Sequence, residues 1–283
     1  MEFTSSVIDL IRKRRSVRSY RNEKLAPETI TIIEKILQSS SSGPFGNQVS
    51  FRLVEKSWAR ENAGVKLGTY GFITGAGYFI AGEVKPHDNC FEDYGFLLET
   101  VMLHLTDLNL GTCWLGGTFK RSDFAEVLGT DQDMVIPAIT PVGFAADKKS
   151  IRESIIRWGA KSDNRKPWTE LFFDNDFSTP LTEASAGKFQ LPLEMLRLAP
   201  SASNKQPWRI VKTNGFFHFY LKRTPGYGKF DGMDLQKIDM GIAMAHFALS
   251  CDSQQLKGTW TKQNPGIPDR NAEYTISWQI VAG

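Results

Sequence analysis

The feature of the sequence that most constrains the fold is a pair of similar segments, each placed after a helical stretch and a loop of small residues. Asn47 is followed by a strand-like run at residues 51–54, and Asn204 is followed by a similar run at residues 208–211. Each run has an aromatic residue, an arginine and two aliphatic residues. Segments that recur in the same order indicate an internal repeat, and a repeat changes which folds the sequence predicts.

A second pair of similar segments lies further along the chain. Asp93 and Asp239 each begin an Asp-x-Gly triplet at the start of a long stretch with apolar residues at helical spacing. These stretches end in Gly-Thr-Cys-Trp at residues 111–114 and in Lys-Gly-Thr-Trp at residues 257–260. Two unrelated units could agree by chance in any one of these pairs, but several pairs in the same order favour duplication.

The repeat predicts an α+β fold of two tandem degenerate modules that form a pseudo-dimer within one chain. A polar stretch at residues 161–188, without a regular apolar pattern, is the expected crossing between the modules. The expected boundaries are 1–165 for the first module and 166–283 for the second. The two modules would then meet as the subunits of a homodimer do.

Composition narrows the classes of function. The 283 residues are enough for two domains, and the net charge of +3 is too small for a typical nucleic-acid binder. Three cysteines without a Cys-x-x-Cys pair argue against a disulfide framework and against a metal site. No stretch approaches the roughly 18 apolar residues of a membrane span, and no signal peptide is recognisable. We therefore expect a cytoplasmic protein without a membrane or nucleic-acid partner.

The densest group of basic residues follows the first short helix. Arg14, Arg15, Ser16 and Arg18 place three guanidinium groups and a hydroxyl within five residues. Arginine suits phosphate, because its planar fork donates paired hydrogen bonds and its charge is permanent. A solvated basic helix end, where cations favour the helix dipole, is the alternative.

Two further segments are rich in small residues. Residues 199–208 read Ala-Pro-Ser-Ala-Ser-Asn-Lys-Gln-Pro-Trp, and residues 111–117 read Gly-Thr-Cys-Trp-Leu-Gly-Gly. Small residues and glycines let the backbone approach a flat ligand closely. Each segment alone reads as an ordinary tight loop or turn.

Together, these three segments resemble those of the FMN-dependent nitroreductase family, and the chain is similar to members in which one chain contains two modules. The arginine segment occurs only in the first module, and the complete Pro-Ser-x-x-Asn-x-Gln-Pro-Trp loop occurs only in the second. In this family each flavin site takes these two parts from different subunits. The resemblance therefore implies a nitroreductase-like fold with one complete FMN site per chain and the other site lost.

The resemblance also implies roles for individual residues. The arginine segment would hold the phosphate and ribityl chain, and the backbone amide of Gly116 would face flavin N5. Lys149 and Arg152 would add a further basic contact to the phosphate. The implied cofactor-binding residues are Arg14, Arg15, Ser16, Arg18, Leu115, Gly116, Gly117, Lys149, Arg152, Pro200, Ser201, Ala202, Ser203 and Asn204.

The reaction implied by the resemblance is hydride transfer from NAD(P)H, through flavin N5, to a nitroaromatic, a quinone or a similar small acceptor. NAD(P)H would be a transient co-substrate, because the sequence has no Gly-x-Gly-x-x-Gly loop or P-loop for a tightly bound nucleotide. The flavin would carry the chemistry, so we expect neither a catalytic side chain nor a metal. A flavin-binding protein without reductase activity and a phosphate- or nucleic-acid-binding module are the alternatives. The pseudo-dimer could stay monomeric or form a further homo-oligomer.

Overall fold

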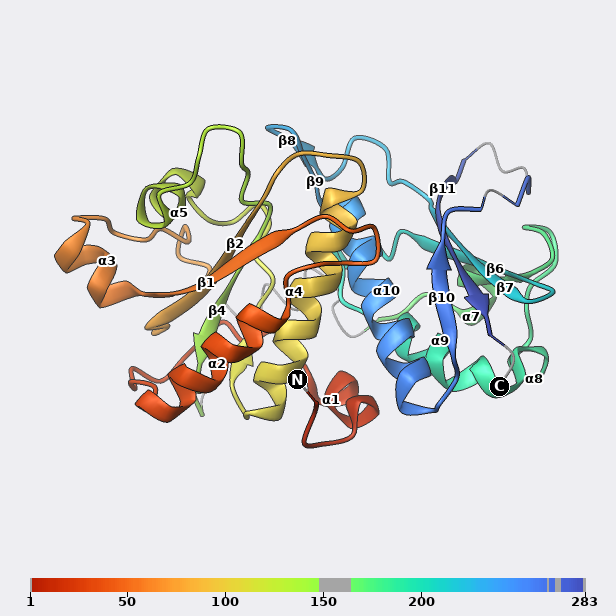
Figure 1. Ribbon diagram of the computed structural model, residues 1–283, viewed down its shortest axis with the longest axis horizontal. Helices are drawn as coiled ribbons and strands as arrows, with labels where there is room; N and C mark the ends of the chain where they lie inside the picture. The colour runs from red at the N-terminus through yellow and green to blue at the C-terminus, as the bar shows by residue number, and fades with distance from the viewer. Residues whose placement is uncertain (1, 148–163, 264, 268–270, 282–283) are drawn as a thin grey trace.

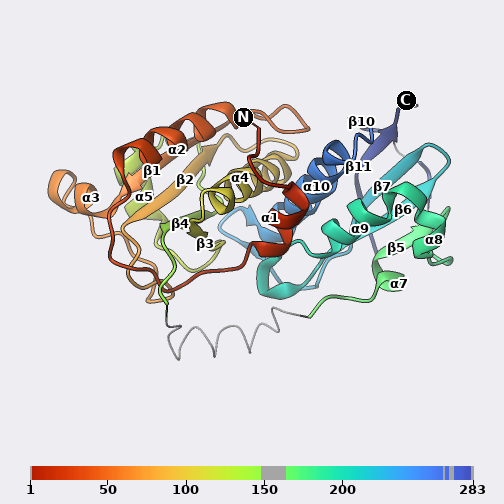
Figure 2. The same cartoon turned by 90° about the horizontal axis from the view of Figure 1, so that it is seen from below.

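The computed structural model describes residues 2–147, 164–263, 265–267 and 271–281. Within these ranges the molecule is elongated, with one sheet toward each end and two long helices side by side between them (Figure 1, Figure 2). We call residues 2–147 the first half and residues 164–281 the second half. The arrangement is the mixed helix-and-sheet architecture that the sequence predicts.

The first half contributes a four-stranded antiparallel sheet with the strand order β1-β2-β4-β3. Pro27 occupies the first turn of its second helix, where its missing N–H is not needed. The elements are α1 (Val7–Lys13), α2 (Pro27–Ser39), β1 (Val49–Glu55), α3 (Lys56–Asn62), β2 (Tyr78–Val84), α4 (Cys90–Asp107), β3 (Gly111–Thr112), α5 (Arg121–Leu128) and β4 (Ile139–Gly143).

The second half contributes a five-stranded sheet with the order β10-β11-β7-β6-β5, in which only β5 runs parallel to its neighbour. Strands β8 and β9 form a separate two-stranded ribbon. The elements are α7 (Trp168–Leu171), β5 (Phe172–Asp174), α8 (Glu183–Ala186), α9 (Gln190–Arg197), β6 (Trp208–Thr213), β7 (Phe216–Leu221), β8 (Lys229–Phe230), β9 (Met233–Asp234), α10 (Leu235–Ser253), β10 (Gly258–Thr261) and β11 (Glu273–Ile280), with 3-10 turns at Gly187–Phe189 and Ala202–Asn204.

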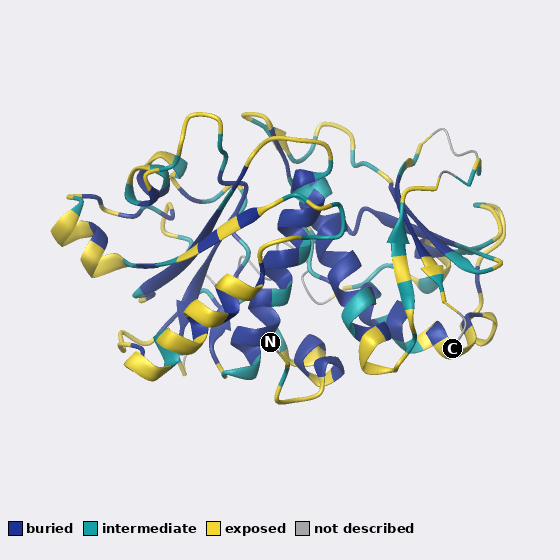
Figure 3. Ribbon diagram, in the orientation of Figure 1, coloured by how far each residue is buried: buried dark blue, intermediate teal, exposed yellow. Residues whose placement is uncertain are grey.

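The long helices α4 and α10 form the centre of the molecule and are buried on nearly all sides (Figure 3). A helix with apolar residues around most of its circumference is expected to be buried in this way. Leu98 of α4 and Phe247 of α10 belong to one hydrophobic core that extends into both sheets. The two halves therefore share a core, and packing between the helices is the main contact that joins them.

Two glycines allow α4 and α10 to approach closely. A Cβ atom at Gly95 would lie 2.2 Å from the carbonyl oxygen of Ile238, and one at Gly241 would lie 1.9 Å from the carbonyl oxygen of Glu92. The contact is reciprocal, because each glycine lies three residues after the carbonyl that meets the other glycine. This close approach is a physical reason for the glycine in each Asp-x-Gly triplet.

The two halves share an order of elements and of strand pairing. In each half a helix is followed by two strands of the main sheet, a long helix and two more strands of that sheet, and β6-β7-β11-β10 repeats the order β1-β2-β4-β3. The long helices also end alike, because each is followed by a residue with a left-handed backbone, Asn109 after α4 and Gln255 after α10. The amide of the next residue, Leu110 or Leu256, donates back to the last turn of the helix. The halves differ where α3 separates β1 from β2, since β6 and β7 are joined by a tight turn.

The expectation that residues 161–188 form an unpatterned crossing is wrong for the part that the structure describes, residues 164–188. This part contains α7, β5 and α8, and β5 extends the second sheet. Phe172 is fully buried and packs on the ring of Trp168, with 4.4 Å between ring centroids. Elements of three or four residues are too short to show a periodic pattern, which explains why the sequence did not reveal them.

The buried ring of His218 should make the stability of the fold depend on pH. Its ring is buried between the hydroxyl groups of Thr213 and Ser277, at 2.9 and 2.7 Å, and burial lowers its pKa to about 4. Burial also lowers the pKa of His104 to about 4. An unfolded chain takes up these protons near pH 6.5, so stability present above that pH is lost as the pH falls toward 4.

The thermal midpoint should therefore decrease between pH 6.5 and 4, and His218→Gln should make this decrease shallower. Thermal unfolding followed by circular dichroism at several pH values measures both slopes. An unchanged slope in a His104→Gln/His218→Gln variant would exclude these two histidines as the cause.

Candidate functional site

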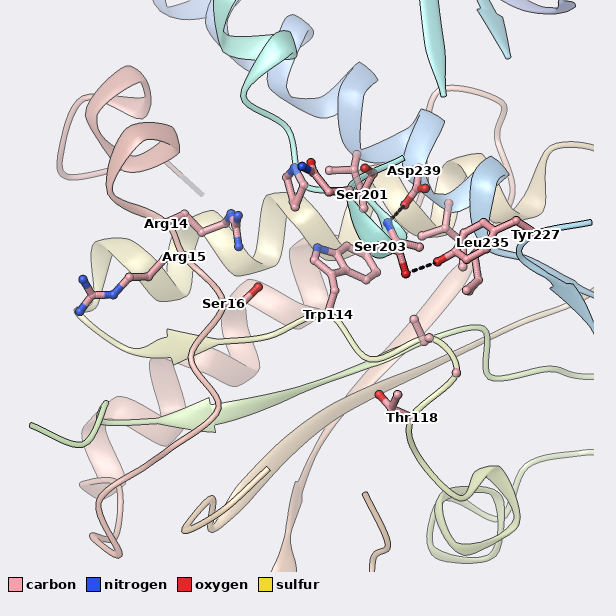
Figure 4. A pocket seen from close by; sticks show the side chains of 18 of the residues that line it. Arg14, Arg15, Ser16, Trp114, Thr118, Ser201, Ser203, Tyr227, Leu235 and Asp239 are labelled. Carbon is pink, nitrogen blue, oxygen red and sulfur yellow. Dashed lines mark hydrogen bonds between the residues drawn. The ribbon is translucent and has the colours of Figure 1, made fainter. Parts of the chain in front are cut away.

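A cavity of about 370 Å³ lies between the two halves, beside α10 and the turn after β3 (Figure 4). This volume is within the usual range for small-molecule and cofactor sites. Its lining comes from both halves of the chain. The lining residues are Arg14, Arg15, Ser16, Arg18, Trp114, Gly116, Gly117, Thr118, Ala138, Arg165, Pro200, Ser201, Ala202, Ser203, Asn204, Tyr227, Leu235, Ile238, Asp239 and Ile242.

Most of the residues that the sequence singled out meet in this cavity, including the arginine segment, both glycines and the whole of residues 200–204. Leu115 does not line it. The Leu115 side chain is buried in the core of the first half, and its backbone pairs with Ile139. Lys149 and Arg152 lie outside the described residues.

The arginine segment is held against the first sheet. The Val17 amide donates a 2.8 Å hydrogen bond to the carbonyl of Thr112, and the Val17 side chain enters the core. Extended backbone alternates its side chains, so the residues on either side of Val17, Ser16 and Arg18, face the cavity instead. Arg15 is exposed, and Figure 4 shows it pointing away from Trp114.

The arginine end of the cavity contains donors that need an acceptor. The Arg14 side chain is only 6% exposed, and its Nε atom lies 3.3 Å from Oε1 of the buried Glu99. The Nη1 atoms of Arg14 and Arg18 are buried and have no hydrogen-bond partner among the described residues. Buried charged donors without partners are costly, so this end of the cavity favours an anionic ligand.

The loop at residues 200–206 forms the opposite wall, between α9 and β6. The Ala202 amide donates a 2.9 Å hydrogen bond to Asp239, and the Gln206 amide donates one of 2.9 Å to the Ser201 hydroxyl. Ser203 has a left-handed backbone, and its hydroxyl accepts a 2.9 Å hydrogen bond from Tyr227. A left-handed non-glycine residue is strained, and such residues persist where surrounding contacts enforce them.

Asp239 contributes an unusual carboxyl group to this wall. It is buried, its Oδ1 atom accepts from Ala202, and its Oδ2 atom has no hydrogen-bond partner among the described residues. Burial raises the pKa of Asp239 well above its usual value. A carboxyl that keeps its proton can donate a hydrogen bond into the cavity, which a carboxylate cannot.

The turn at Gly116 and Gly117 is covered from the second half. A Cβ atom at Gly116 would lie 2.5 Å from Cδ2 of Leu235, and one at Gly117 would lie 3.8 Å from the ring of Phe230. Arg121 joins the two sides, because its guanidinium donates to the Gly116 carbonyl and lies 4.9 Å from the Phe230 ring centre. The close approach of Leu235 is itself a reason for glycine at position 116.

The family of this chain follows from its match to a known family model. The sequence model of the family described as "Putative TM nitroreductase" matches residues 6–251. The chain belongs to this nitroreductase family. This result confirms the family that the sequence resemblance indicated, and it gives the chain a general oxidoreductase role.

Individual relatives of this nitroreductase agree with the assignment. A curated relative from Archaeoglobus fulgidus, named "Putative NADH dehydrogenase/NAD(P)H nitroreductase", is 24% identical over 177 residues, which cover 57% of this chain and 98% of the relative. A crystal structure described as a "putative nitroreductase" from Thermotoga maritima is 20% identical, with 99% of this chain and 96% of that chain covered and a TM-score of 0.62. That similarity shows the fold.

A nitroreductase from Desulfitobacterium hafniense with bound FMN is also similar in part. It is 20% identical and covers 52% of this chain and 92% of its own, with a TM-score of 0.39. So limited a similarity carries no conclusion about this chain.

Several lining residues of this nitroreductase were not among those that the sequence singled out. Asp239 was visible only as the start of a repeated triplet, and Tyr227 only as part of a Gly/aromatic stretch that could equally be a surface loop. Arg165 gave no signal, because it lies in a stretch without a pattern. These residues become recognisable only when the two halves are placed side by side.

Two negative findings apply to the described residues. No group of histidine, cysteine, aspartate and glutamate side chains among them is arranged to hold a metal ion. In the same part of the chain, no helix is both long and apolar enough to cross a bilayer.

Proposed function

We propose that this nitroreductase binds one FMN in the cavity between its halves and uses it to transfer hydride from NAD(P)H to a nitroaromatic, quinone or similar acceptor. The observation that carries the proposal is that the arginine segment of the first half and the Pro-Ser loop of the second half line the same cavity. The fit to FMN is supported by the unpartnered Nη1 atoms of Arg14 and Arg18, which suit a phosphate.

Each part of the cavity would have a distinct role in the proposed reaction. Bound FMN would supply the hydride chemistry. Arg14 and Arg18 would hold its phosphate, and the Gly116 amide is the proposed donor to the flavin ring. Leu235 would exclude water beside that turn, and a protonated Asp239 could donate a hydrogen bond to a ligand.

We also propose that the chain arose by tandem duplication and is an intrachain pseudo-dimer, with modules at residues 1–165 and 166–283. The shared order of strands and the reciprocal contacts of Gly95 and Gly241 support this proposal. The curated relative supports it as well, because nearly its whole length corresponds to little more than half of this chain. The pseudo-dimer would need no second chain to complete the site.

The region corresponding to the cavity on the other side of the pseudo-dimer supports a single site. In the first half Phe45 takes the place of Ala202, and in the second half Lys262 takes the place of Gly116. The Lys262 ammonium lies 5.4 Å from the centre of the Phe45 ring and donates a 2.6 Å hydrogen bond to Asn89. Bulky side chains thus meet where the corresponding residues of the cavity are small.

A flavin-binding protein without reductase activity is the second candidate. It is favoured by the contact of Leu235 and Phe230 with the Gly116–Gly117 turn, since this cover would limit access for a second substrate. A nucleic-acid-binding function is not favoured, because the Arg14 side chain is buried in the cavity and not exposed on the surface. The three cysteines are free and buried, which fits the reducing cytoplasm that we propose as the location.

The absorption spectrum of the purified protein, with released flavin counted per chain, tests this function. We expect about one FMN per chain, bleached by NAD(P)H without oxygen. About two per chain would exclude the single-site proposal, and flavin that NAD(P)H does not reduce would favour the second candidate. Absence of flavin after incubation with excess FMN would exclude both.

A further inference from the structure

A buried polar cluster behind the arginine end of the cavity joins the two halves. Glu99, on α4, is fully buried. Its Oε1 atom lies 2.9 Å from Nε2 of His246 on α10 and 3.3 Å from Nε of Arg14. Its Oε2 atom accepts a 2.6 Å hydrogen bond from the indole of Trp114. Arg14 and Trp114 line the cavity, so Glu99 and His246 contact its wall from behind.

The hydrogen-bond partners of His246 favour one protonation state of its ring. His246 Nδ1 lies 2.9 Å from the carbonyl oxygen of Met195, which can only accept. Burial opposes ionisation of Glu99, but the charge of Arg14 and the hydrogen bond from His246 outweigh it and hold the pKa of Glu99 below its usual value. Glu99 is therefore a carboxylate and also accepts. Both ring nitrogens of His246 therefore face acceptors, an arrangement that an imidazolium satisfies with two donated hydrogen bonds and a neutral ring with only one.

With the His246 ring as an imidazolium, the charges in the cluster sum to one positive unit. Arg14 and this ring are then the cations, and Glu99 is the one anion in contact with them among the described residues. A neutral His246 would leave Glu99 to cancel the charge of Arg14, and the cavity would gain little attraction for an anion. In a buried setting such charges act strongly, because little water screens them.

We propose that His246 is a positioning residue for anion binding: its positive charge balances Glu99, so that the charge of Arg14 remains available to a phosphate group in the cavity. The inference rests on the proposed function, in which this phosphate belongs to FMN. His246 does not line the cavity and acts through Glu99 and Arg14. Elements packed around His246 present Arg14 and Glu99 as charged groups and the Met195 carbonyl as a neutral acceptor.

The test compares FMN with riboflavin, which lacks the phosphate, in the His246→Gln variant. Glutamine keeps a donor toward Glu99 but removes the charge. We expect FMN to bind about tenfold more weakly or worse, with riboflavin affinity nearly unchanged. Titration of flavin fluorescence measures both. His104→Gln is the matched control, because His104 stacks on Phe3 and does not line the cavity, and this change should alter neither affinity.

Rescue separates a charge effect from loss of packing. Adding Glu99→Gln to His246→Gln removes the anion that would otherwise cancel Arg14, so the preference for FMN over riboflavin should return. An equal loss of FMN and riboflavin affinity in the single variant, or no return of the preference in the double variant, would overturn the inference. Should the single variant fail to fold, the double variant still tests the inference, because the double variant must keep the wild-type preference for FMN over riboflavin.

Inorganic phosphate separates this inference from the proposed function. If the wild-type chain binds neither flavin, the proposed function fails. Inorganic phosphate is then the probe, and the rise that it causes in the thermal midpoint is the measurement. A rise in the wild type that is lost in His246→Gln supports the role of His246. No rise in the wild type, or the same rise in both proteins, overturns it.

Discussion

Arg14→Ala and Ser201→Trp should each abolish FMN retention, although the two residues lie in different halves of the chain. Removing Arg14 deletes a buried charged donor from the proposed phosphate site and leaves Glu99 without its cationic neighbour on that side. Tryptophan at position 201 would fill part of a cavity of about 370 Å³ and lose the acceptor for the Gln206 amide. Losses of about a hundredfold or more in affinity are expected, because each change removes or blocks a buried polar contact.

Flavin retained after gel filtration, measured by absorbance, gives the result of this experiment. Arg12→Ala is the control for charge, because Arg12 is adjacent in sequence but exposed and does not line the cavity. Ser253→Trp is the control for bulk, because Ser253 is an exposed serine at the end of α10. Normal FMN retention in either cavity variant, with folding verified by circular dichroism, would show that the two halves do not share one site.

The parts of the structure that could be predicted from the sequence are those with a local physical cause. Pro27 marks the start of α2, and the Asp-x-Gly triplets lie in the first two turns of both long helices, which begin three and four residues earlier than the triplets indicate. The two glycines are required by the close approach of α4 and α10. Asp93 accepts two backbone hydrogen bonds from the loop before β1, and Asp239 accepts one from the loop before β6. Short motifs with such strict requirements remain readable in a single sequence.

Other features depend on partners far away in the chain, so no local sequence pattern indicates them. Glu99 and His246 look like ordinary helix residues, and their importance appears only when α4 and α10 lie together. The contact of Leu235 with Gly116 joins residues more than a hundred positions apart. The proposed phosphate contacts Lys149 and Arg152 remain predictions outside the described residues.

The second large effect is expected at the crossing of α4 and α10. Gly241→Val should lower the free energy of unfolding by about 3 kcal/mol or more, because overpacking at a backbone contact cannot be relieved by moving one side chain. A Cβ atom there would lie 1.9 Å from the Glu92 carbonyl oxygen and 2.7 Å from the Phe96 amide nitrogen. Gly95→Val faces the reciprocal clash, and the two effects should not add, since either change already separates the helices.

Urea unfolding measures the loss, and Gly77→Ala is the matched control, because a Cβ atom at Gly77 would meet nothing within 4 Å. The same variants also test whether the cavity depends on the crossing of α4 and α10. Ile238, Asp239 and Ile242, which surround Gly241 on α10, line the cavity. Widening the crossing should therefore weaken FMN binding along with stability, whereas Gly77→Ala should change neither. A Gly241→Val protein that loses stability but binds FMN normally would show that the cavity does not depend on how closely the two helices approach.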